Sequence, residues 1–225
     1  MNANATFNFL KELRKNNTRE WFYEHANEYD NLHYSFEKKI DELVHLLEKH
    51  NTELSGLDGR DCTWRIYRNN YFVSESSQYK TNFAAFIAKG GKKSPYCGYY
   101  IHIEPDNCYI AGSIWSPESL VLAQIRKDIT ERNHEFEAIL EDPELQMYYT
   151  DMELQENNPE TIDSLQLKDI QKLNKLAIIS RIDDSVFQNN NWTSHVYNRC
   201  TVLKRFQSFV NESIENNLRM RNYAL

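Results

Sequence analysis

The chain has 225 residues, 40% of them hydrophobic and 26% charged, with a net charge of −7. This length suits a single domain over residues 1–225 with a sizeable core, and the acidic balance makes nucleic acid an unlikely partner and argues against an anionic membrane surface. No segment resembles an export signal or contains a run of about 18 apolar residues, so we expect a cytoplasmic protein with no membrane association.

The N-terminal part of the chain, residues 6–50, is predicted to be helical. Phe7–Lys15 forms a short amphipathic helix, and a second helix follows a polar break. Asn17 and Glu20 have the spacing of an N-cap with a reciprocal glutamate. The apolar residues that follow recur at three- and four-residue steps, with an interruption expected near His25–Asn27.

The β-type pattern is concentrated in residues 63–115. Thr63–Arg68 alternates apolar and polar residues, whereas Thr81–Ala88 is apolar on both faces, which is typical of a strand in the middle of a sheet. Gly98–Ile103 and Cys108–Trp115 are predicted to form a hairpin across a turn of four residues.

The hairpin register follows from the length of its turn. A four-residue turn pairs Ile103 with Cys108 and Ile101 with Ile110, whereas a three-residue turn would mix the apolar and polar faces. The preferred register leaves a second face that is both aromatic and polar. This face is either half covered by helices or one wall of a cleft, and its residues are Tyr100, His102, Tyr109, Ala111, Ser113 and Trp115.

The C-terminal part, residues 117–222, is predicted to be mainly helical. Ser116 caps a helix that starts at Pro117, and Asp183-Asp184 caps a shorter one. Asp151–Pro159 is acidic and rich in asparagine, which indicates a mobile surface loop. Four further segments complete this part: helices at 134–140 and 162–173, a strand or packed extended segment at Leu176–Ile182, and a long helix from Trp192 to Ile214.

These elements predict an α+β fold, in which an antiparallel sheet of about four or more strands, residues 63–115, is packed by the N- and C-terminal helices. The four cysteines have no metal-binding or redox spacing and are expected to be reduced. No metal site or cofactor is predicted. No nucleophile–base–acid set can be assembled, so the sequence leaves open whether the protein is an enzyme.

Several central segments carry a family resemblance. RIYRNNYF, YKTNF, GGKKSP, GYYIHIEP and GSIWSP, with FNFLKELRKNNTREWF at the start, resemble domain-of-unknown-function family 2461 in order and spacing. The family consists of conserved hypothetical proteins of bacteria and fungi, and the resemblance implies no established activity. The chain departs from the family pattern at Asn69, where an aspartate is usual, and at Ser74–Gln78, where a charged run is usual.

The functional prediction rests on a basic strip. Residues 60–95 contain seven basic and two acidic residues, a net charge of +5 in an acidic protein. Guanidinium groups and glycine-rich backbone suit phosphate or carboxylate recognition. We therefore predict that Arg65, Arg68 and Lys80 bind a small anionic or phosphate-bearing ligand. Tyr67, Tyr100 and His102 would line the cleft.

Two alternatives to this ligand site remain. The basic strip could be a set of solvated charges on a sheet edge, where lysines prevent edge-to-edge pairing. The protein could also be a non-enzymatic interaction module that uses the same face for a protein partner.

Overall fold

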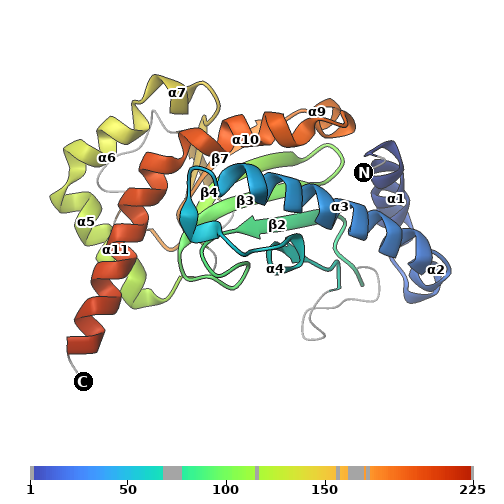
Figure 1. Cartoon of the computed structure of the whole chain (residues 1–225), viewed down its shortest axis with the longest axis horizontal. Helices are drawn as coiled ribbons and strands as arrows, with labels where there is room; N and C mark the ends of the chain where they lie inside the picture. Colours follow the sequence, from blue (N-terminus) through green and yellow to red (C-terminus); the bar gives the residue numbers. More distant parts are fainter. Residues whose placement is uncertain are drawn as a thin grey trace. The chain divides into compact units, whose positions relative to one another are not determined.

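The structure is a computed structural model, and it describes residues 3–67, 78–114, 117–155, 158–161, 170 and 173–223. Within these residues the chain forms helices and an antiparallel sheet (Figure 1), which confirms the predicted α+β class.

The described helices are α1 (Ala3–Lys15), α2 (Arg19–Glu24), α3 (Ala26–Leu47), η1 (Thr52–Leu54), α4 (Gly59–Cys62), α5 (Ser119–Glu131), α6 (Asn133–Leu140), α7 (Pro143–Gln146), α9 (Asp184–Gln188), α10 (Trp192–Val202) and α11 (Lys204–Tyr223). The strands are β1 (Thr63–Trp64), β2 (Phe83–Ile87), β3 (Cys97–Ile103), β4 (Cys108–Ile114), β5 (Asp151–Gln155), β6 (Asn158–Thr161) and β7 (Ala177–Ile182). Their order in the sheet is β1-β2-β3-β4-β7-β5-β6.

Strand β2 lies between β1 and β3, and all five of its residues are buried. This confirms the central strand predicted from its apolar faces, since both sides of it are covered. Strand β1 is shorter than predicted, because only Thr63 and Trp64 pair with β2. Beyond Ile66 the pairing resumes as one bridge between Tyr67 and Tyr79.

The chain divides into two compact units. One contains Met1–Lys92, Ile101–Tyr109 and Arg181–Tyr197, and the other contains Lys93–Tyr100, Ile110–Ser180 and Asn198–Leu225. In the first unit α3 packs on β2 and α4, and α1 and α2 pack on α3 (Figure 1). In the second unit α11 packs against α5 and α6. The single domain over residues 1–225 stays a prediction.

The β3–β4 hairpin has the expected burial. Ile101, Ile103 and Ile110 are fully buried. The ring of His102 stacks on that of Tyr109 with 4.6 Å between centroids. These two residues are opposite each other in the predicted four-residue-turn register, so the ring contact agrees with that register.

The prediction of a surface loop at Asp151–Pro159 is wrong. The segment contains β5 and the first half of β6, and Met152 pairs with Glu160 on one side and Ile178 on the other. Met152 is completely buried. The acidic composition concealed a strand because the apolar strand that pairs with β5, β7, comes later in the sequence.

Three helix boundaries also differ from prediction. Thr18, not Asn17, caps α2 by accepting from the backbone N–H of Trp21. Helix α5 begins at Ser119 with Glu118 as its N-cap, so Pro117 precedes the helix; Ser116 lies outside the described residues. The long C-terminal helix is divided at Leu203 into α10 and α11.

Other local predictions are confirmed. The break near residue 25 separates α2 from α3, and Asp183 caps α9 through the backbone N–H of Ser185. The strand at Leu176–Ile182 is β7. The helix predicted at 162–173 lies largely outside the described residues.

Candidate functional site

A cleft of about 710 Å³ lies in the first unit, where α3, α4, β1 and the loop after Gly91 meet. We call it the α3–β1 cleft. It is lined by three cationic side chains, two carboxylates, three rings and one hydroxyl: Arg60, Arg65, Lys92; Asp30, Glu37; His33, Tyr34, Trp64; and Thr63. The cations come from the basic strip of the sequence, and the acidic lining residues come from α3.

Two glycines allow the walls of the cleft to approach each other. A Cβ atom on Gly59 would lie 2.1 Å from the carbonyl oxygen of Glu37, so only glycine lets α4 start this close to α3. A Cβ on Gly91 would lie 2.8 Å from the carbonyl oxygen of Asp61, and Gly91 has a φ of +83°. The next residue, Lys92, donates its backbone N–H to that same carbonyl at 2.8 Å.

The two arginines of the cleft are held by long, exposed ion pairs, whereas Lys92 makes a hydrogen bond. The Arg60 Nε atom lies 3.7 Å from Glu37 Oε2, and the Arg60 side chain is 75% exposed. The Arg65 Nη1 atom lies 4.0 Å from Asp30 Oδ1, and these two side chains are 64% and 66% exposed. The ammonium group of Lys92 donates to the backbone carbonyl of Arg60. Ion pairs this long and exposed contribute little to stability.

His33 lies at the inner wall of the cleft and is buried. Its Nε2 atom is 3.2 Å from the carbonyl oxygen of Trp64, and its Nδ1 atom is 3.3 Å from Glu37 Oε1. Burial lowers the pKa of His33 below its usual value, while the Trp64 carbonyl and the Glu37 carboxylate oppose this change. Glu37 therefore links the buried imidazole to the exposed guanidinium of Arg60.

Thr63 adds a polar group without a partner among the described residues. The residue is 3% exposed, and its Oγ1 atom makes no hydrogen bond there. Buried hydroxyl groups in folded proteins are nearly always hydrogen-bonded. A hydroxyl left unpartnered in the lining of a cleft is a place where a bound molecule could supply the missing partner.

Of the six ligand-binding residues predicted from the sequence, Arg65 lines this cleft. Tyr67 is 49% exposed, and its ring contacts Phe22, Tyr29 and Tyr79. Lys80 donates its backbone N–H to Ile66 at 2.8 Å and is absent from the lining.

Two of the remaining three predicted residues do not line the cleft, and the third lies outside the described residues. Tyr100 is half-buried on β3, in the second unit. His102 is buried on the part of β3 that belongs to the first unit. Arg68 lies outside the described residues.

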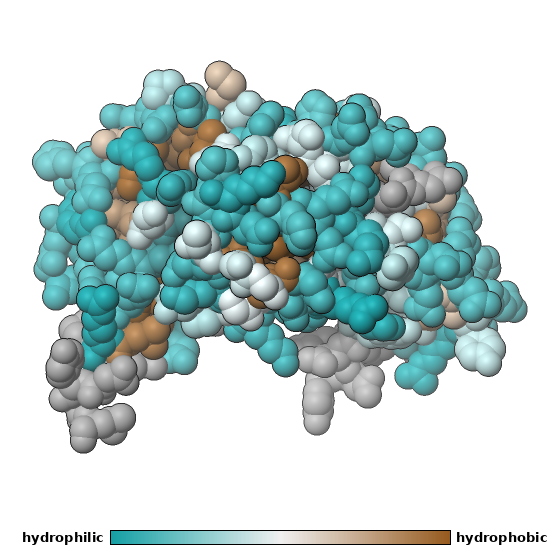
Figure 2. All heavy atoms as spheres, viewed as in Figure 1, coloured by the Kyte–Doolittle hydropathy of each residue, from teal (hydrophilic) through white to brown (hydrophobic). Residues whose placement is uncertain are grey.

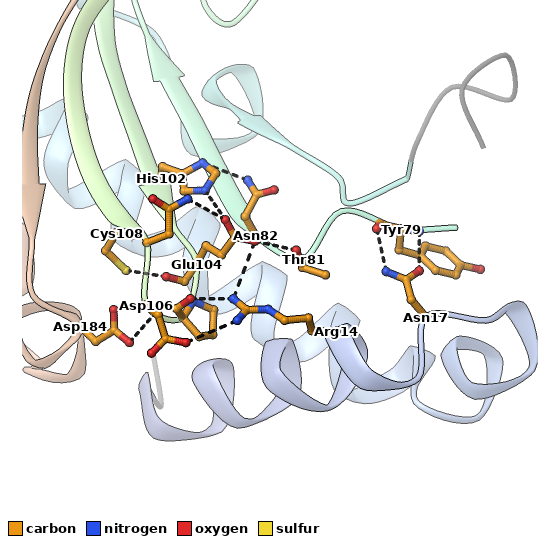
Figure 3. Close-up of polar contacts among 12 residues, drawn as sticks. Arg14, Asn17, Tyr79, Thr81, Asn82, His102, Glu104, Asp106, Cys108 and Asp184 are labelled. Carbon is orange, nitrogen blue, oxygen red and sulfur yellow. Dashed lines mark hydrogen bonds and ion pairs between the residues drawn. The ribbon is translucent and has the colours of Figure 1, made fainter. Parts of the chain in front are cut away.

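His102 belongs instead to a hydrogen-bond network around Glu104 (Figure 3). The Glu104 carboxylate accepts from Thr81 Oγ1 at 2.6 Å, from His102 Nε2 at 3.1 Å and from Asn107 Nδ2 at 3.0 Å. Because a carboxylate only accepts, His102 donates from Nε2, and its Nδ1 accepts from Asn82 at 3.4 Å.

The Glu104 network joins three of the segments that carry the family resemblance. Arg14, from the opening segment, donates to the Pro105 carbonyl at 2.6 Å and lies 3.9 Å from Glu104. Asn17 binds both the backbone N–H and the carbonyl of Tyr79, at 2.8 and 2.9 Å (Figure 3).

Burial alone would raise the pKa of Glu104. The donors from His102, Thr81 and Asn107 outweigh it and lower that pKa to about 2. The carboxylate is therefore ionised and already bonded to protein donors, which assigns it a structural role rather than a binding one.

None of the α3 residues that line the cleft was predicted from the sequence. Asp30, His33, Tyr34 and Glu37 recur at three- and four-residue steps, which places them on one helix face. His33 and Glu37 stand at i and i+4, a spacing that favours direct contact. This row of polar residues beside the apolar row of α3 is the sequence feature from which the cleft residues could have been predicted.

Other classes of site find less support in the described part of the chain. It contains no group of three or more His, Cys, Asp or Glu side chains placed to hold a metal ion, and none of its helices has the length and apolar character needed to cross a membrane. All four cysteines are free and buried, and burial raises the pKa of Cys62 and Cys108 to about 12. Figure 2 shows a mostly hydrophilic face, with hydrophobic side chains visible in small separate areas.

Comparison with known proteins identifies one family. The model of the conserved hypothetical proteins DUF2461 matches residues 5–209. Searches of curated proteins and of solved structures found no match.

Proposed function

The chain belongs to family DUF2461, whose description as conserved hypothetical proteins names no activity, and we propose from the structure that the α3–β1 cleft binds a small anionic or phosphate-bearing ligand. The observation that carries this proposal is the meeting of Arg60, Arg65 and Lys92 in one concave site of about 710 Å³. That volume is within the range of small-molecule sites, about 300–1,000 Å³.

The loose ion pairs support the proposal. At 3.7 and 4.0 Å, the contacts of Arg60 with Glu37 and of Arg65 with Asp30 are too long for strong hydrogen bonds. A phosphate group would offer both guanidinium groups shorter, charge-assisted hydrogen bonds, which are about twice as strong as neutral ones. The anion would therefore replace weak partners rather than break strong ones.

The predicted ligand residues outside this cleft remain part of the proposal only for a ligand larger than the cleft. Lys80 and Tyr67 follow the cleft residues closely in sequence but do not line it. Tyr100 and His102 are half-buried and buried, respectively. The centre of the proposed site is therefore Arg60, Arg65 and Lys92.

A cytoplasmic location belongs to the same proposal. Its support is the state of Cys62, Cys97, Cys108 and Cys200, which are all free. Free thiols are the usual state in reducing compartments.

The alternative proposal is a protein-interaction surface at the same cleft. Its support is the exposure of Tyr34, at 53%, beside two exposed arginines. Tyrosine and arginine are enriched in protein interfaces and among the residues that dominate their binding energy. In this case the partner would present a carboxylate to the arginines.

A thermal-shift screen against inorganic phosphate, sugar phosphates and nucleotides tests the ligand proposal. A ligand at 100 times its Kd adds about 2.7 kcal/mol of stability. For a chain of this length that corresponds to a rise in Tm of roughly 5–10 °C. Arg65→Ala should abolish the rise, because it removes one of the anion-binding groups, and added salt should reduce it.

Arg219→Ala is the matched control. Arg219 is 72% exposed and its guanidinium lies 3.7 Å from the Glu215 carboxylate, so it resembles Arg65 in exposure and ion pairing but lies outside the cleft lining. It should keep the full rise in Tm. If no anion stabilises the protein, or if Arg65→Ala responds like the original chain, the protein-interaction alternative is favoured.

A further inference from the structure

The lining of the α3–β1 cleft contains more than an anion requires, and this inference rests on the proposed function of that cleft. We propose that its ligand is a nucleoside monophosphate or a close analogue, meaning a phosphate ester that carries hydrogen-bond donors and a planar ring. Three features of the lining point to these three parts of the ligand.

The first feature is the pair of carboxylates. Asp30 and Glu37 line the same cleft as the three cations. A bare phosphate ion would be repelled by both carboxylates. A ligand with hydroxyl or amino donors would instead donate to them while its phosphate binds the arginines and lysine. The mixed charge therefore favours a ligand that has both kinds of group.

The second feature is the two rings that face the cleft. Tyr34 is 53% exposed, and the exposure of Trp64 is intermediate although it belongs to a strand. Exposed aromatic rings at a concave site offer stacking surfaces for a planar group, and stacking adds affinity for any of the bases. A sugar phosphate has no planar aromatic ring and would not stack on these side chains.

The third feature is the size of the cleft together with the hydroxyl of Thr63. A volume of about 710 Å³ is much larger than inorganic phosphate requires. Thr63 Oγ1 is buried in the lining and has no partner within the described residues. A hydroxyl, carbonyl or amino group of a nucleotide can satisfy it, whereas a phosphate held at the exposed arginines need not reach it.

Isothermal titration calorimetry with AMP, UMP, ribose 5-phosphate, adenosine and inorganic phosphate tests the proposal. AMP or UMP should bind at least about fivefold more tightly than ribose 5-phosphate, because stacking of one base is worth about that factor or more. Adenosine alone should bind weakly, since it lacks the group that the cations recognise.

The Tyr34→Leu variant tests the contribution of the aromatic ring to binding separately from that of the phosphate-binding cations. The exposed position tolerates leucine, so the fold should persist, and Tyr34→Leu should weaken AMP binding several-fold while leaving ribose 5-phosphate unchanged. Tyr23→Leu is the matched control: Tyr23 is 84% exposed, lies on α2 and is not part of the cleft lining. It should bind both ligands as the original chain does.

Thr63→Val gives a second, independent variant. It keeps the shape of the side chain and removes a hydroxyl that has no partner in the described part of the chain, so unliganded Tm should stay the same or rise. Affinity for AMP should nevertheless fall. A merely structural threonine would produce the opposite pattern.

The outcomes distinguish the inference from the proposed function. Equal binding of AMP and ribose 5-phosphate, or an unchanged AMP affinity in Tyr34→Leu, would overturn the nucleotide assignment while leaving anion binding intact. Failure of every phosphate compound to bind would overturn both.

Discussion

Glu104 shows how one side chain can fasten several segments of this chain. Its carboxylate accepts from Thr81, His102 and Asn107, which come from the entrance of β2, from β3 and from the turn before β4. From the sequence, His102 was predicted to line a ligand cleft, and this network was not predicted. Thr81 and Asn107 could not be added, because their meeting depends on the register of the sheet.

The ionised Glu104 should make the protein sensitive to acid. Its pKa is about 2 in the folded protein, against an ordinary value of 4.5 for a glutamate carboxyl. A depressed folded pKa contributes stability that is complete above about pH 4.5 and is lost as the pH falls toward 2. At about 1.4 kcal/mol per pH unit, the loss is at most about 3 kcal/mol.

Glu104→Gln should remove this dependence. In urea unfolding between pH 5 and pH 2, the variant should lose less free energy of unfolding than the original chain, by up to about 3 kcal/mol. Glu42→Gln is the control, because Glu42 pairs with Lys39 at the surface and is 51% exposed. Identical acid profiles for Glu104→Gln and the original chain would contradict the structural role of Glu104.

At the scale of elements, the α3–β1 cleft depends on two close backbone contacts. Gly59 starts α4 against α3, and Gly91 brings the loop against the end of α4. Neither contact is predictable from local pattern, since each joins segments that are distant in the chain.

Gly90 and Gly91 offer a paired test of that contact. Both have a φ of +83°, but a Cβ on Gly90 meets nothing within 4 Å, whereas a Cβ on Gly91 meets the Asp61 carbonyl at 2.8 Å. Gly90→Ala should cost only the backbone strain, about 1–2 kcal/mol. Gly91→Ala should cost more and should also weaken anion binding, because it displaces Lys92.

Thermal unfolding and phosphate titration of both variants check this prediction. The expected order of Tm is original chain, then Gly90→Ala, then Gly91→Ala, with reduced anion affinity only in Gly91→Ala. Equal losses in the two variants would mean that the contact with Asp61 does not shape the cleft.

At the scale of the whole molecule, the features that could be predicted from the sequence are those that follow from the pattern of apolar residues. The α+β class, the buried central β2 and the strand β7 all followed from apolar patterns. Strands β5 and β6 were missed because their stabilisation comes from pairing, of β5 with β7 and of β6 with β5, rather than from their own composition. The basic strip was visible as charge, and Arg60, Arg65 and Lys92 do meet.

The acidic half of the cleft was not predictable in the same way. Asp30, Glu37 and His33 belong to α3, whose orientation against α4 and β1 is a tertiary property. In the sequence these residues lie outside the basic strip of residues 60–95, whereas in the fold they line the same cleft as its cations. An overall charge of −7 therefore conceals a site with three cations at one cleft.

The most direct test of anion binding is to locate an anion in a crystal of the protein. Tungstate mimics phosphate and gives a strong anomalous signal, so its position can be assigned without ambiguity. The predicted result is a tungstate ion in the α3–β1 cleft within hydrogen-bond distance of Arg65 and of Arg60 or Lys92. Tungstate bound only elsewhere, for example in the hollow lined by Lys11, Arg14 and Lys15 on α1, with an empty α3–β1 cleft, would contradict the proposed site.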